Sequence, residues 1–302
     1  MTALRFMNAP FARRLLAGAA LLWTASAHAQ AWLPDGGTTS FGTSYTNTFV
    51  KEHYLPNGHT LDAGHTRVLT YDFAAAYSPT DYWMFNATVP LVSSEYHGSK
   101  PHPTEVDNGQ YHTTLTDLRL EAHYQLLQEP VALAPYVAYV WPTHDYEHLG
   151  HAAPGRGLTE TWLGMGVGKS LDRWIHRTYV QARFTYAWVE KVAGVSHNRE
   201  NIDFDVGYYV NPRVALQALM QWQKTIGGID VPIPKTNPLF PHHDQLAADD
   251  HTNIGGGISW FLSDVSTWSL AYMQGVKGRN GHKVDSQFSL AYTYGFFGFR
   301  PH

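Results

Sequence analysis

The sequence contains no cysteine, and this absence excludes two kinds of site. A disulfide framework and a thiolate metal site both need cysteine, so neither can stabilise this chain of 302 residues. Long apolar runs are missing as well. Beyond the N-terminal region, no stretch approaches the ~20 uninterrupted apolar residues that a membrane-spanning helix needs. The sequence therefore excludes a membrane protein built from helices.

The N-terminal region has the three parts of a secretory signal peptide. An apolar run at 15–25 is followed by the small residues of Ala27-His28-Ala29. The basic residues that precede the run are Arg5, Arg13 and Arg14. Such a run is too short to span a bilayer as a helix and is typical of a segment removed on export. We expect cleavage after Ala29, so that 1–29 is the signal peptide and 30–302 forms a single domain.

The expected mature segment is acidic and rich in aromatic residues. Three of the 21 Lys and Arg residues belong to the signal peptide and none of the 25 Asp and Glu residues does, which leaves a net charge of −7. A negative surface argues against nucleic acid as a partner. The 10 Trp, 18 Tyr and 14 Phe residues belong either in a core or in the aromatic girdles of a membrane barrel.

A stretch near the C-terminus, 284–296, alternates between two kinds of side chain. The intervening residues are small or polar, and the apolar positions are Phe288, Leu290, Tyr292, Tyr294 and Phe296. Successive side chains of a strand point to opposite faces, so this segment predicts a strand with one aromatic face and one polar face. A closed barrel crosses a membrane with strands whose apolar side chains face the lipid and whose polar side chains face the interior.

The same design repeats along the chain and predicts about twelve antiparallel strands. Short connections alternate with mostly longer ones, which is the arrangement of outer-membrane barrels. We therefore predict an all-β fold, a transmembrane antiparallel β-barrel of the bacterial outer membrane, in contact with lipid. A soluble β-sandwich or lipocalin-like barrel is the alternative. The expected strands are 40–53, 66–77, 82–96, 112–127, 131–146, 158–171, 178–190, 201–210, a ninth after 211–213, 251–262, 267–276 and 284–296.

Several short motifs add a family resemblance. The hairpin at 71–91 contains the turn Ala-Tyr-Ser-Pro-Thr-Asp and ends in Val-Pro-Leu; 116–124 reads Thr-Asp-Leu-Arg-Leu-Glu-Ala-His-Tyr, and Pro142-Thr143 opens a loop. Together these motifs resemble the outer-membrane proteins of the meta-pathway of phenol degradation over nearly the whole mature chain. Thr116 and His144 stand where that family usually has glycine. The resemblance implies an outer-membrane barrel that takes up small, often aromatic compounds.

The polar faces of the predicted strands provide the first candidate site. Charged side chains there would project into the lumen, where they either line a path for small solutes or fill a narrow barrel. A loop, or residues 30–39, could plug the barrel. Glycines at 164, 166 and 168 would leave room for a neighbouring side chain or an inward loop. The candidate lumen-lining residues are Asp72, Asp117, Arg119, Glu121, His123, Glu160, Arg183, Asp203, Asp205 and Gln217.

Histidine provides the second candidate site. Of the 17 histidines in the expected mature segment, 14 fall at the long-loop end of the predicted barrel, and the densest run contains His144, His148 and His151. Neutral imidazole together with carboxylate suits a divalent transition metal such as zinc, copper or nickel. Surface capture of a metal ion is therefore the alternative function, although loop histidines can also simply be solvated. We otherwise expect no cofactor.

Catalysis is the third hypothesis, and we expect no enzyme. Ser196-His197-Asn198 contains the residue types of a hydrolase triad, but neighbours in sequence rarely face one another on a short loop. A protease-like group can be drawn from Asp249, Asp250 and His251 on the same weak basis. The predicted function is diffusion of small molecules through a charged lumen, and the family resemblance implies that these molecules can be aromatic or hydrophobic. Metal capture and a purely structural or adhesive barrel remain open, and so does the oligomeric state.

Overall fold

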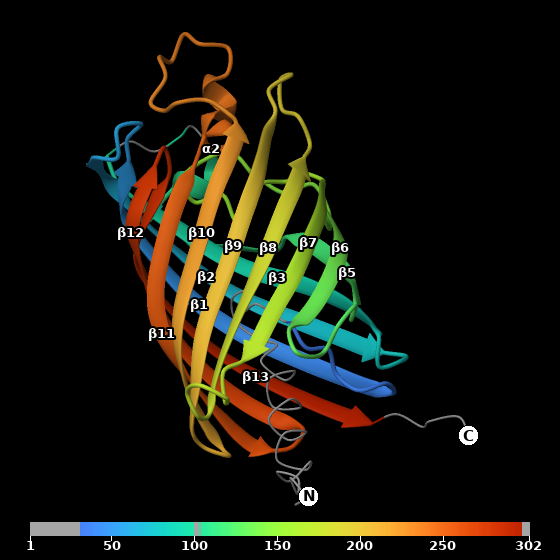
Figure 1. Ribbon diagram of the computed structural model, residues 1–302. Coiled ribbons are helices and arrows are strands. Elements are labelled where there is room, and N and C mark those ends of the chain that lie inside the picture. The colour runs from blue at the N-terminus through green and yellow to red at the C-terminus, as the bar shows by residue number, and fades with distance from the viewer. Residues whose placement is uncertain (1–30, 100–101, 103, 298–302) are drawn as a thin grey trace, which may run out of the picture.

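A computed structural model of the protein describes residues 31–99, 102 and 104–297, and these residues form a closed antiparallel barrel (Figure 1). The expected signal peptide, 1–29, lies outside the described residues. The strands are β1 (Thr38–Tyr54), β2 (Thr60–Ser78), β3 (Trp83–His97), β4 (His112–Leu115), β5 (Asp117–Tyr124), β6 (Ala132–Pro142), β7 (Glu160–Ser170), β8 (Thr178–Val189), β9 (His197–Asn211), β10 (Val214–Gly227), β11 (Asp250–Ser263), β12 (Ser266–Arg279) and β13 (His282–Phe297).

The short strands β4 and β5 together occupy one position in the wall, because both pair with β3. Leu91 pairs with Leu115 and Thr88 pairs with Arg119, so three residues on one side face two on the other. This is a β-bulge, and Pro90 lies in it. Proline has no N–H to donate to a ladder, which explains why the pairing is interrupted here. The barrel therefore has the twelve wall strands that the sequence predicts.

The barrel closes because each of the twelve wall positions, with β4 and β5 counted as one, has two neighbours. β1 pairs with both β2 and β13, and β2 also pairs with β3, which joins the two ends of the sheet. A β-sandwich leaves strand edges, whereas a closed barrel leaves none and so satisfies its backbone without water. The soluble sandwich is thus excluded by topology.

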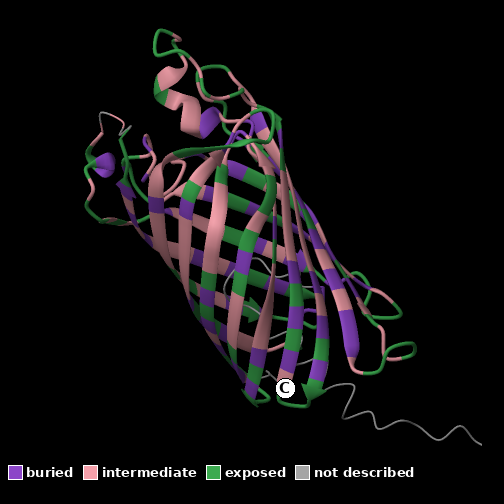
Figure 2. Cartoon of the chain, turned by 90° about the vertical axis from the view of Figure 1, so that its left-hand side faces the viewer, coloured by how far each residue is buried: buried purple, intermediate pink, exposed green. Residues whose placement is uncertain are grey.

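The polarity of the wall is the reverse of that of a soluble protein, because apolar side chains cover the outside and charged side chains lie inside. Outward apolar side chains such as Phe73 and Val137 are 49% and 53% exposed, while the charged side chains of Glu121 and Asp205 are only 5% and 1% exposed. Figure 2 shows the resulting bands of buried and exposed residues along each strand. An apolar exterior around a polar interior is stable only where lipid covers the outside. The fold is that of an outer-membrane β-barrel.

The longest connections lie at one end, as predicted, but the long loop predicted at 54–65 is only 55–59 because β2 begins at Thr60. The short turns at one end are 79–82, 125–131, 171–177, 212–213 and 264–265, and the connections at the other end are 55–59, 98–111, 143–159, 190–196, 228–249 and 280–281. The loop 98–111 contains η1 (Glu105–Asp107), and the loop 228–249 contains η2 (Phe240–His242) and α2 (His243–Leu246). No helix in the described part of the chain is long and apolar enough to cross a membrane.

Several strand ends differ from the prediction: β6 ends at Pro142 instead of 146, β12 ends at Arg279 instead of 276, and two strands begin earlier than predicted. β2 begins at Thr60 instead of 66, and β9 begins at His197 instead of 201. The additional residues carry no regular apolar alternation, because these strand ends extend toward the long loops and are not selected to face lipid. Residues 60–62 of β2 pair with β1, and residues 197–200 of β9 pair with β10, so both extensions belong to the sheet.

Candidate functional site

Glu121 lies in the barrel interior and contacts three basic side chains. The Glu121 carboxylate lies 3.0 Å from Nη2 of Arg183 and 2.8 Å from Nε of Arg119, and Nε2 of His123 lies 2.8 Å from its second oxygen. Arg119, Glu121 and His123 share one face of β5 because alternate residues point the same way. Arg183 belongs to β8, which β6 and β7 separate from β5 in the wall. This contact therefore spans the inner faces of β6 and β7.

An inward tyrosine supports the same charged group. The ring centroid of Tyr136 lies 4.1 Å from the Arg183 guanidinium carbon and 4.9 Å from the ring centroid of His123, with the two rings stacked. The Tyr136 hydroxyl is hydrogen-bonded to the Thr185 hydroxyl. The Tyr136 ring also lies against Gly164, where a Cβ atom would approach it to 2.2 Å. The predicted role of this glycine, making room for a neighbouring side chain, is confirmed.

A second polar layer lies toward the short-turn end. Nε2 of Gln181 donates to Asp205 at 2.8 Å, and the Gln217 amide donates to the Tyr179 hydroxyl at 3.2 Å while it accepts from Ser259 at 3.2 Å. In the register of β8 and β9, Asp203 lies directly opposite Arg183. Aspartate side chains thus line the interior on β9, two residues apart.

The other predicted residues lie nearer the long loops or on the first hairpin. Glu160 forms an ion pair with Arg199 and accepts from the Trp162 indole at 2.7 Å. The Tyr146 hydroxyl donates to Asp117 at 2.5 Å, and the Ser44 hydroxyl donates to Asp72 at 2.9 Å. Sequence reasoning did not include Arg199, because the predicted eighth strand began only at 201.

Residues 31–33 lie inside the barrel near its short-turn end. Oε1 of Gln125 accepts from the Leu33 amide at 2.7 Å, and Nε2 of the same side chain donates to the Ala31 carbonyl at 3.0 Å. Trp32 is 7% exposed, and a Cβ atom on Gly168 would come within 2.6 Å of its ring. The sequence raised 30–39 as a plug; residues 31–33 lie inside the barrel, whereas Thr38 and Thr39 already belong to β1.

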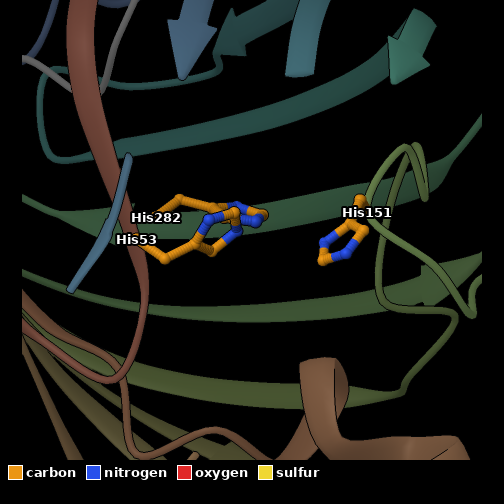
Figure 3. Close-up of side chains that lie close together, drawn as sticks. All are labelled: His53, His151 and His282. Carbon is orange, nitrogen blue, oxygen red and sulfur yellow. The ribbon is translucent and has the colours of Figure 1, made fainter. Parts of the chain in front are cut away.

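The long-loop end gathers histidines, but not in the grouping that the sequence suggested. A ring nitrogen of His144 lies 3.0 Å from the Thr114 hydroxyl, and Nδ1 of His148 lies 3.0 Å from the Tyr146 carbonyl oxygen. Among the described residues, neither joins His151 in a group of three donor atoms. His151 instead meets His53 and His282, with one ring nitrogen of each within 4.8 Å of the others (Figure 3). His151 also belongs to a second group, with His102 and Asp244.

Asp107 holds the backbone of the two loops that carry His102 and His151. Its carboxylate accepts from the amides of His102, His151 and Ala152 at 2.8, 3.2 and 2.9 Å and contacts Nδ1 of His102 at 2.9 Å. Burial acts to raise the pKa of Asp107, but these hydrogen bonds outweigh it and lower the pKa to about 2. Burial alone would lower the pKa of His102, and the Asp107 hydrogen bond with the charge of Asp244 raises it instead.

Some members of the residue groups considered for catalysis contact residues outside those groups, while Asp249 contacts His251 within its own group. The Asn198 side chain donates to the Tyr186 hydroxyl at 3.3 Å and accepts from the Val189 amide at 3.0 Å. Asp249 lies 3.3 Å from Nδ1 of His251, while Asp250 lies 3.1 Å from Nη2 of Arg279. The two carboxylates therefore contact different basic groups.

The closed wall, the apolar exterior and the charged interior define the class of protein: an outer-membrane β-barrel. No protein-family model matches the chain, and no curated protein matches it either. Among solved structures, the chain is similar to an outer-membrane channel from Pseudomonas putida F1, with 15% identity over 90% of this chain and 99% of that one and a TM-score of 0.69. The β domain of the Bordetella autotransporter BrkA is also similar, with 10% identity over 86% of this chain and 100% of that one and a TM-score of 0.52. At these identities the likeness confirms the fold, and the resemblance to the phenol meta-pathway family stays a prediction.

Proposed function

We propose that this barrel is a channel that lets small solutes cross the outer membrane by diffusion through its lumen. The observation that carries the proposal is the set of charged side chains on the inner face, which cross-connect strands that are not neighbours in the wall. A purely structural barrel needs only packed side chains inside. Glu121 and Arg183 pair with each other, but Oδ1 of Asp205 is buried without a hydrogen-bond partner among the described residues, and interior charge that is not fully paired must meet water.

Two features would set the selectivity of this channel. The acidic side chains of β9, Asp203 and Asp205, favour cations over anions, while Arg183 on the neighbouring strand β8 and Arg119 on β5 oppose them. The segment at 31–33 narrows the short-turn end, so only small molecules would pass while it remains in place. The family resemblance extends the proposal to small aromatic or hydrophobic compounds as the solute class.

Ion selectivity tests this proposal. We expect Asp203→Asn with Asp205→Asn to shift the reversal potential in a salt gradient at pH 8 toward lower cation preference. The matched control is Asp81→Asn with Asp264→Asn, which removes the same charge from exposed positions in the short turns. Equal reversal potentials in the lumen variant and the wild-type barrel would show that these aspartates do not line the path.

A further inference from the structure

We propose that His53, His151 and His282 form a binding site for a divalent transition-metal ion, and that the ion clamps the loop 143–159 to the barrel wall. His53 and His282 are cross-strand partners at the long-loop ends of β1 and β13. His151 belongs to the β6–β7 loop, and β2, β3 and the β4–β5 pair separate β6 from β1 in the wall. An ion held by all three would therefore bridge the mouth of the barrel.

The donor atoms are arranged for such an ion. The ring centroids of His53 and His282 lie 4.4 Å apart, those of His53 and His151 lie 5.5 Å apart, and one nitrogen of each residue lies within 4.8 Å of the others. Figure 3 shows the His151 ring facing the other two across a gap. Zn–N bonds of about 2.0–2.1 Å place tetrahedral ligands about 3.4 Å apart, so small movements of the three imidazole rings complete the site.

Unpaired nitrogens give a second and independent indication of a ligand. Both ring nitrogens of His53 and Nδ1 of His151 are buried without a hydrogen-bond partner among the described residues. A buried polar atom without a partner is costly, and imidazole nitrogens that make no hydrogen bond are free to bind a metal. Three neutral imidazoles with a fourth position for water are a donor set that suits zinc, and nickel and copper also accept imidazole.

Neighbouring residues hold both the backbone and the imidazole ring of His151 in place. Asp107 accepts from its amide at 3.2 Å, and its carbonyl accepts from the Thr66 hydroxyl at 3.4 Å. The Tyr96 ring stacks on the imidazole with ring centroids 4.5 Å apart, and the Tyr96 hydroxyl donates to the Ala63 carbonyl at 2.6 Å. A ligand positioned in this way loses little freedom when an ion binds.

Zinc binding to the barrel purified from outer membranes, without a histidine tag, tests the site. We expect one Zn²⁺ ion per barrel by titration calorimetry, and His53→Gln with His282→Gln to weaken its binding by at least about tenfold. The matched control, His144→Gln with His148→Gln, removes two other histidines from the same end and should leave the affinity unchanged. Because His282 is exposed, His282→Gln alone replaces the double variant if the latter does not fold.

Three results would overturn the assignment. One is the absence of a stoichiometric ion in the wild-type barrel. Another is an equal loss of affinity in the His144 and His148 control. The third is a loss confined to His102→Gln with Asp244→Asn, which would place the ion in the second donor group around His151. With Co²⁺ as the probe, absorption typical of tetrahedral coordination should appear in the wild-type barrel and disappear in the His53 and His282 variant.

The clamp has its own measurement. Because the chain has no cysteine, Asp145→Cys on the loop and Lys51→Cys on β1 can be spin-labelled uniquely. We expect Zn²⁺ to shorten and narrow the distance distribution between the two labels, and to leave it unchanged when His53 and His282 are replaced. A distribution that does not respond to bound zinc in the wild-type background would show that the ion does not clamp the loop.

Discussion

Removing Arg183 tests whether the interior ion pairs are as the structure places them. Arg183 and Glu121 are 7% and 5% exposed and lie 3.0 Å apart, so Arg183→Met leaves a buried carboxylate with one partner fewer. Breaking a buried pair by removing one partner costs about 3–5 kcal/mol. Arg119 and His123 still contact Glu121 at 2.8 Å, so we expect a loss of about 3 kcal/mol, at the lower end of that range.

The measurement is the free energy of unfolding from urea titrations in lipid vesicles, followed by tryptophan fluorescence. Glu121→Gln and the double variant complete a cycle, for which we expect a coupling energy of about 1–3 kcal/mol. Arg279→Met is the control, because Arg279 forms a more exposed pair with Asp250 near the long loops, 41% and 26% exposed. A loss no larger than that of Arg279→Met, with coupling near zero, would refute the ion pair between Glu121 on β5 and Arg183 on β8.

Two further predictions test the membrane face and the N-terminal segment. Val137→Arg should destabilise the barrel in lipid by about 2–4 kcal/mol, whereas Leu61→Arg, near the end of β2 toward the long loops, should have little effect; equal effects in urea titrations would contradict the assigned lipid face. Gly168→Leu should push Trp32 out of the short-turn end and raise single-channel conductance, because a Cβ atom there already approaches the Trp32 ring to 2.6 Å. Unchanged conductance would mean that the segment does not restrict the path.

The wall strands could be predicted because lipid imposes a simple rule on them. Each strand that faces lipid must alternate apolar and polar residues, so the phase of alternation identifies the inner face. That is why Glu121, Arg183 and Gln217 could be placed inside without a structure. The interruption at Thr116 was not predicted, because a bulge depends on the partner strand, where Pro90 lacks an N–H.

The rest of the site depends on contacts that leave no periodic pattern. Arg199 lies on the part of β9 beyond the regular alternation, so the rule that found Glu160 could not find its partner. The histidine group unites three residues that are distant in sequence, His53, His151 and His282, and only the folding of the loops brings them together. Nearness in sequence suggested His144 and His148 instead, although their rings contact local hydroxyl and carbonyl groups.

Single-channel conductance of the refolded mature protein in a planar bilayer tests the channel most directly. We predict a steady current proportional to salt concentration, and a larger one for Trp32→Ala, because that variant loosens the segment inside the lumen. Trp174→Ala, in an exposed short turn, serves as the control and should conduct like the wild-type barrel. Demonstrably folded barrels that carry no current, in the wild type and in Trp32→Ala alike, would contradict the proposal that this protein is a channel.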